Sequence, residues 1–131
     1  MGNVTVRFFD ESSLEAAADL ILSAWEYYLQ EAEPSRVKAL LEENLDHPAW
    51  KVLIAFENEL PVGVAEFSIT ESYRCDGEEA RLELLFIRDT AGNYYDVHAA
   101  LMNGIFEFLR KEKIEFLRID TTLENADVMV V

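Results

Sequence analysis

A short polar loop between an apolar run and an amphipathic helix is the part of this sequence best suited to chemistry. Residues 82–87 are typical of a strand, and a helix is expected to begin at Asp96. At the start of a helix, backbone N–H groups and the positive end of the helix dipole together attract phosphate. Such a site favours glycine, which has no Cβ, whereas this one has Asp96 and His98. Asp96 is therefore either a carboxylate that repels phosphate or an N-cap residue that stabilises the helix.

Each of the other side chains of this loop is compatible with a ligand-binding role and with a purely structural one. His98 can donate to a phosphate when protonated, or it can be a solvated residue of the first helical turn. Tyr94 and Tyr95 can stack on an adenine or pack as a cover over the loop. Arg88 is the nearest cation, but Asp89 lies beside it. From the residues alone, phosphate binding at this loop is disfavoured and not excluded.

Length and charge limit the classes of protein to consider. The chain has 131 residues, which indicates a single domain spanning residues 1–131. It carries 11 basic and 26 acidic side chains, for a formal net charge of −15. A surface this negative repels phosphate backbones and anionic lipids, so we expect neither a nucleic-acid nor a membrane partner.

Cysteine, histidine and leader patterns exclude other classes. Cys75 has no second cysteine with which to form an intramolecular disulfide, and we expect a free surface thiol. His47 and His98 are too far apart in the sequence, without cysteine partners, to predict a metal site. The N-terminus lacks the apolar core of a signal peptide, and no apolar run is long enough to span a membrane. We therefore expect a cytoplasmic protein.

Hydrophobic periodicity predicts a mixed α/β domain, of the α+β class. Strand-type and helix-type patterns alternate in the order β-α-α-β-β-β-α-β, which predicts a mostly antiparallel sheet flanked by helices. Gly63, inside the third expected strand, predicts a bulge or a close backbone approach there. The expected elements are strands near 4–8, 50–56, 62–69, 81–87 and 114–122, and helices within 10–33, 35–47 and 96–113.

This order, together with the stretches LELLFI, AALMNGIFEFL and IEFLRIDTTLEN, resembles the GNAT superfamily of acyl-CoA N-acyltransferases over essentially the whole chain. In that family an apolar strand ends near a valine, and a loop of the form Arg/Gln-x-x-Gly-x-Gly/Ala then opens a helix. The resemblance implies acetyl-CoA as co-substrate. It places Ile87 at the valine position and Asn93 at the basic position, while Asp96 and His98 fall on the two glycines. Val97 lies between them, and Asn125 matches an asparagine after the next strand.

The resemblance also implies a general base on the strand before the loop. A family glutamate on that strand takes the amine proton, and Glu83 stands at a matching position. Strand alternation predicts that Glu83, Leu85 and Ile87 share one face, where apolar neighbours would raise the pKa of the Glu83 carboxyl. The alternative is a solvent-facing carboxylate paired with Arg81 or Arg118. Glu66 and Glu71 on the preceding strand are weaker candidates for the base.

Two functions follow from the resemblance. The first is transfer of an acyl group from acetyl-CoA to a primary amine, where the acidic surface favours a cationic small molecule or peptide as acceptor. The second is a catalytically inactive GNAT-like binding or regulatory module, favoured by the departures in the loop. We expect a GNAT-like domain truncated at its C-terminus, without the family's last two strands. Residues 127–131 are then expected to pair with a second copy of the chain, as a homodimer. Trp25 is expected in the core.

Overall fold

The computed structural model describes residues 3–27, 31–72, 77–120 and 126–130. Six strands, three α-helices and one short 3₁₀ turn make up this part of the chain. In sequence order they are β1 (Val4–Phe8), η1 (Glu11–Ser13), α1 (Leu14–Tyr27), α2 (Pro34–Glu43), β2 (Trp50–Glu57), β3 (Leu60–Ser72), β4 (Gly77–Ile87), α3 (Tyr94–Lys111), β5 (Phe116–Asp120) and β6 (Ala126–Val130). The predicted mixed α/β class and the predicted order of the first eight elements are confirmed.

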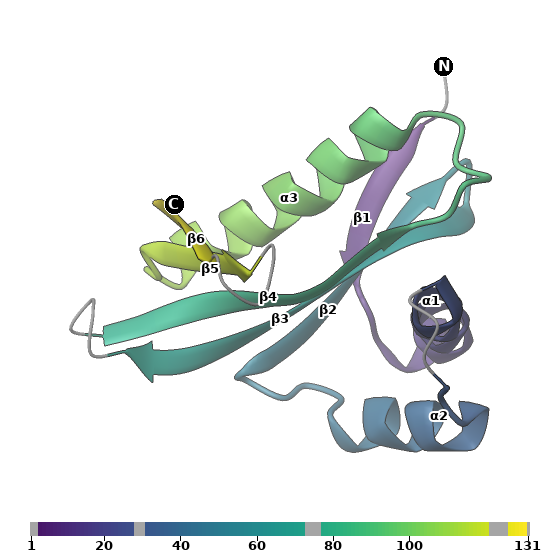
Figure 1. Ribbon diagram of the computed structural model, residues 1–131, viewed down its shortest axis with the longest axis horizontal. Coiled ribbons are helices and arrows are strands. Elements are labelled where there is room, and N and C mark those ends of the chain that lie inside the picture. The colour runs from purple at the N-terminus through teal and green to yellow at the C-terminus, as the bar shows by residue number, and fades with distance from the viewer. Residues whose placement is uncertain (1–2, 28–30, 73–76, 121–125, 131) are drawn as a thin grey trace.

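One twisted sheet organises the molecule, and its strands lie in the same order as in the sequence, β1-β2-β3-β4-β5-β6. Every neighbouring pair is antiparallel except β4 and β5, which are parallel and are connected through α3. Figure 1 shows α3 across one face of the sheet, and α1 with α2 on the other face. The sheet therefore separates two layers of core.

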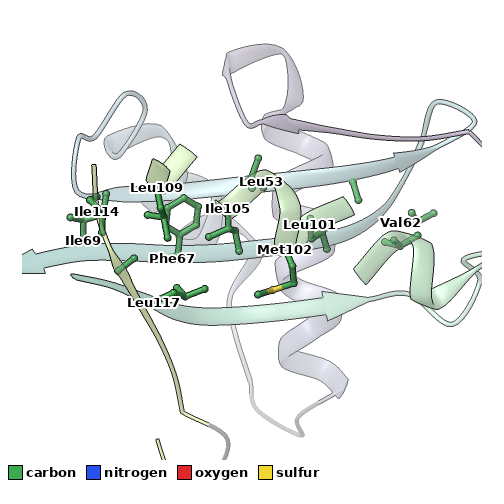
Figure 2. Packing of buried hydrophobic residues seen from close by; sticks show 14 residues of the cluster. Leu53, Val62, Phe67, Ile69, Leu101, Met102, Ile105, Leu109, Ile114 and Leu117 are labelled. Atoms are coloured by element: carbon green, nitrogen blue, oxygen red, sulfur yellow. The ribbon is translucent and has the colours of Figure 1, made fainter. Parts of the chain in front are cut away.

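Each face of the sheet buries its own apolar cluster, because alternate residues of the strands point to opposite sides. On the α3 face the cluster contains Phe67 of the sheet and Leu101 and Ile105 of α3, all fully buried (Figure 2). On the α1 and α2 face, Ile54 and Val64 of the sheet pack against the apolar sides of the two helices. The 3.6-residue period of the helices and the two-residue period of the strands produce this arrangement.

Gly63 lies at a close contact between the sheet and the start of α3, as the sequence predicted. The pairing of β2 with β3 shifts so that Val62 is the extra residue of a bulge beside Gly63. A Cβ on Gly63 would lie 3.1 Å from Val97 and 3.2 Å from Leu101, both on α3. The missing side chain thus lets the first turns of α3 approach β3 closely.

The structure corrects two expectations. Residues 126–130 form β6, a strand absent from the predicted order, which pairs with β5 and ends the sheet. Pairing of this segment with a second copy of the chain stays a prediction. Trp25 is 37% exposed and is not a core residue. Asp10 is the N-cap residue of the first helical segment, where Asp10 and Ser13 form a capping box.

In the described part of the chain, no helix is long and apolar enough to cross a membrane.

Candidate functional site

An irregularity in β4 defines the centre of the candidate site. Along the β3–β4 pair, Glu66 faces Leu84 and Phe67 faces Leu82, so that Glu83 is left as an extra residue in β4. This is a β-bulge, which bends its strand and redirects a side chain. The bulge therefore lies at Glu83, the residue predicted as the general base.

The bulge also marks the point where β4 and β5 separate. The two strands pair at three positions, from Ala80 with Leu117 to Leu82 with Ile119. Within the described residues, the rest of β4, from Glu83 to Ile87, has no strand partner on the β5 side. In Figure 1 β5 and β6 accompany only the first half of β4. Backbone N–H and C=O groups on this edge are therefore available to an extended ligand.

The bulge changes the face on which Glu83 lies. Leu85 and Ile87 pack against the cluster under α3. The Glu83 side chain instead accepts a hydrogen bond of 2.7 Å from Ser68 Oγ, on the α1 and α2 face. The prediction that Glu83 shares a face with Leu85 and Ile87 is therefore wrong, because the extra residue resets the alternation of the strand. Glu83 is exposed, and its partner is Ser68 rather than the predicted arginines.

Glu66, a weaker candidate from the sequence, has the more unusual environment of the two carboxylates. Burial of its side chain raises the pKa of the Glu66 carboxyl. The indole N–H of Trp50 donates to Glu66 Oε1 at 2.9 Å and opposes this rise, while the negative charge of Glu83 adds to it. The site thus holds two interacting carboxylates, one exposed and one largely buried.

Replacement of Glu66 by glutamine should flatten part of the dependence of stability on pH. Because the pKa of Glu66 is raised in the folded state, the folded protein holds this proton more tightly than the unfolded chain does. The resulting stabilisation is complete below the ordinary glutamate pKa of about 4.3 and is lost as the pH rises through the raised value. Urea unfolding between pH 4 and pH 8 measures the effect.

In Glu66→Gln the amide oxygen can still accept from Trp50, and this fall in the free energy of unfolding should disappear. Glu71→Gln is the matched control, since Glu71 is an exposed carboxylate on the same strand. Identical pH profiles for Glu66→Gln and the unmodified protein would contradict the assignment.

The loop between β4 and α3 is ordered by its own side chains. Asn93 is the N-cap residue of α3, and its side-chain oxygen accepts from the Asp96 N–H at 3.1 Å. The prediction that Asp96 caps the helix is wrong, because α3 begins two residues earlier, at Tyr94. Among the described residues, the Tyr94 and Tyr95 amides donate no hydrogen bond. These two N–H groups are the free donors at this helix end.

A carboxylate from the last residue of β2 closes one side of the loop. Glu57 Oε1 accepts from the Gly92 N–H at 2.7 Å. A Cβ on Gly92 would lie 3.2 to 3.4 Å from the three carboxylate atoms of Glu57, so the carboxylate lies directly against this glycine. The two residues are 35 positions apart in the sequence, and no sequence pattern points to their contact.

The other residues predicted to bind the coenzyme differ in their positions relative to the loop. Ile87 is the last residue of β4, opposite Gly63, and Val97 is fully buried in the core, so only its backbone faces the loop. His98 is half-buried and stacks on the Tyr94 ring, with centroids 6.1 Å apart. Asn125 lies outside the described residues. Ile87, Asn93 and Val97 thus border the loop, and His98 contributes a ring at its side.

A hollow of about 690 Å³ lies where α1 ends and α2 begins. Its walls combine carboxylates with apolar and aromatic side chains. The lining residues are Leu22, Trp25, Glu26, Glu31, Ala32, Glu33 and Pro34. The last turn of α1 also reaches β4, because the Tyr27 ring lies 5.9 Å from the ring of Phe86, three residues beyond the bulge. The end of α1 therefore contributes both to the hollow and to a contact with β4.

Comparison with known proteins identifies the fold. No family model and no curated protein matches the sequence. A solved structure of a probable acetyltransferase has a TM-score of 0.80 at 17% identity, over 92% of this chain and 80% of that chain. An aminoglycoside N-acetyltransferase in complex with CoA has a TM-score of 0.79 at 20% identity, over 95% and 81% of the two chains. A GNAT family acetyltransferase from Staphylococcus aureus has a TM-score of 0.78 at 14% identity, over 100% and 95%.

Proposed function

Because this chain has the fold of the GNAT acetyltransferases, we propose that it transfers an acyl group from acetyl-CoA to a cationic primary amine. The observation that carries the proposal is the bulge at Glu83, where β4 loses its pairing with β5. That arrangement combines an open strand edge with a carboxylate and leads directly to the start of α3. The strand edge can hold an extended donor, the carboxylate can accept a proton, and the helix start can attract the phosphates of the donor.

Residues of β4 and of the loop after it fit the acyl donor. The free edge from Glu83 to Ile87 offers backbone hydrogen bonds to the amide groups of a pantetheine arm. The unpaired amides of Tyr94 and Tyr95, at the positive end of α3, fit the diphosphate. When bound, the thioester supplies an activated carbonyl carbon to which the amine nitrogen adds.

Glu83 is proposed as the general base. The acceptor enters as an ammonium ion and must lose a proton before its nitrogen can form the C–N bond. Glu83 is exposed, with one oxygen fixed by the Ser68 hydroxyl, so its carboxylate is oriented and accessible. Glu66, whose pKa is raised by burial, lies on the same face and is the second candidate for this proton. Loss of the thiolate as the C–S bond breaks completes the transfer.

The hollow between α1 and α2 is proposed as the acceptor site. Glu26, Glu31 and Glu33 concentrate negative charge around it, and the partly exposed Trp25 offers an aromatic face to a cation. A polyamine or a basic peptide tail has the charge spacing that such a surface attracts. One solved structure of similar fold is an aminoglycoside N-acetyltransferase, whose acceptors are also amines.

Two measurements test the proposal. Calorimetry should detect binding of acetyl-CoA, and release of free thiol should depend on an added polyamine such as spermidine. In Glu26→Gln/Glu33→Gln the KM for spermidine should rise about tenfold with little change in kcat, since these charges act on binding. Glu107→Gln/Glu112→Gln alters the net charge equally, at exposed positions on and just after α3, and should leave the KM unchanged.

A binding module without catalysis is the second candidate function. The observation that favours it is the loop itself, where Glu57 and Asn93 already occupy the amides of Gly92 and Asp96. No heat with acetyl-CoA at hundreds of micromolar, together with no thiol release, would make this function the better one.

A further inference from the structure

The Glu57 carboxylate occupies part of the loop at which the donor's diphosphate is expected. It is held by a 2.7 Å hydrogen bond from the Gly92 amide, and its three carboxylate atoms face the bare Cα of that glycine. An oxygen anion fixed on a loop amide before a helix is the arrangement that a phosphate oxygen would otherwise make. The protein thus supplies its own anion to this loop.

The free donors of the loop lie only a short distance further along the chain. Tyr94 and Tyr95 follow Gly92 by two and three residues, so chain length alone keeps their amides within roughly 14 Å of the Glu57 carboxylate. Asp96 adds a second carboxylate in the first turn of α3. A diphosphate that binds the free amides must therefore approach a negative charge that is already in place, which lowers its affinity.

From these contacts we infer that Glu57 is a specificity-determining residue that weakens binding of the diphosphate end of the acyl donor and leaves binding of the pantetheine arm unaffected. The inference rests on the proposed function. It predicts that the diphosphate adds little to donor affinity in the unmodified protein. Coenzyme A and pantetheine, which lacks the diphosphate and the nucleotide, should then bind with similar strength.

Glutamine at position 57 separates the effect of the negative charge from the effect of the hydrogen bond that anchors the loop. In Glu57→Gln the amide oxygen can still accept from Gly92, so the loop keeps its position while the negative charge is removed. Calorimetry should show coenzyme A binding about tenfold more tightly than in the unmodified protein, while pantetheine affinity stays the same. The gain should shrink at 0.5 M NaCl, because exposed charges are then screened over about 4 Å.

Two further variants make the test specific. Glu59→Gln removes an exposed charge from the turn just after β2 and leaves the β4–α3 loop unaltered. It should leave both affinities unchanged. Glu57→Ala removes both the charge and the anchor. It should lose the gain seen with glutamine if the anchored loop is needed to hold the diphosphate.

The outcomes distinguish this inference from the proposed function. If the unmodified protein binds coenzyme A more than tenfold tighter than pantetheine, or if Glu57→Gln leaves the ratio of the two unchanged, the inference is wrong and acyl transfer still stands. If no variant binds either ligand, both the inference and the proposed function are wrong.

Discussion

Gly63→Val should lower the free energy of unfolding by about 2 kcal/mol and displace the start of α3. Even a single Cβ at this position would lie 3.1 Å from Val97, 3.2 Å from Leu101 and 3.3 Å from the carbonyl oxygen of Phe86. The last of these contacts is with the backbone and cannot be relieved by a rotamer change. Urea denaturation gives the loss of stability, and calorimetry with coenzyme A gives the effect on the loop.

The effect should be graded by side-chain size. Gly63→Ala needs shifts of only a few tenths of an ångström and should destabilise less than valine does. Thr70→Val, at an exposed position of the same strand, tests whether a β-branched apolar residue in β3 is itself harmful, and it should change stability by less than about 0.5 kcal/mol. Equal stability of Gly63→Val and the unmodified protein would show that α3 does not rest on β3 at this point.

Glu83→Gln should reduce the rate of acyl transfer about 100-fold, because a positioned general base contributes a factor of that order. The glutamine amide oxygen can keep the 2.7 Å bond from Ser68, so the geometry of the bulge is preserved. The value of kcat at saturating acetyl-CoA and spermidine is the measurement.

Ser68→Ala is the matched variant for this prediction. It leaves the Glu83 carboxylate in place without its hydrogen bond, and it should lose much less activity than Glu83→Gln. An unchanged kcat in Glu83→Gln would exclude Glu83 as the base. If Glu66→Gln alone then lowered kcat by a similar factor, the half-buried Glu66 carboxylate would be the proton acceptor.

The fold could be predicted from the sequence because its signals are local. Apolar residues recur with the helical period along residues 96–111 and with the strand period near the N-terminus, and the faces they define are the buried faces of the structure. The close approach at Gly63 was predicted correctly for the same reason, since a glycine inside an apolar strand usually marks one. Strand β6 was missed because its five residues carry no turn or cap signal of their own.

The details of the site depend on contacts between distant residues, and these could not be predicted. Alternation assumes a regular strand, and nothing in residues 82–87 shows that Glu83 is an extra residue, so its face was assigned wrongly. The contact of Trp50 with Glu66 joins β2 to β3. The contact of Glu57 with Gly92 joins the end of β2 to the loop before α3. Such pairs exist only once the sheet has formed, whereas the sequence shows each member as an ordinary polar or aromatic residue.

The identical order of the strands in the sheet and in the chain has a consequence for how the protein folds. The entropy lost on closing a loop increases with its length, so strands that follow one another closely are the least costly to join. β2 and β3 are separated only by Asn58 and Glu59, whereas β1 must wait for α1 and α2 to be placed before it meets β2. Nucleation should therefore begin at the β2–β3 hairpin, and the β4–β5 pairing, which spans the whole of α3, should be among the last to form.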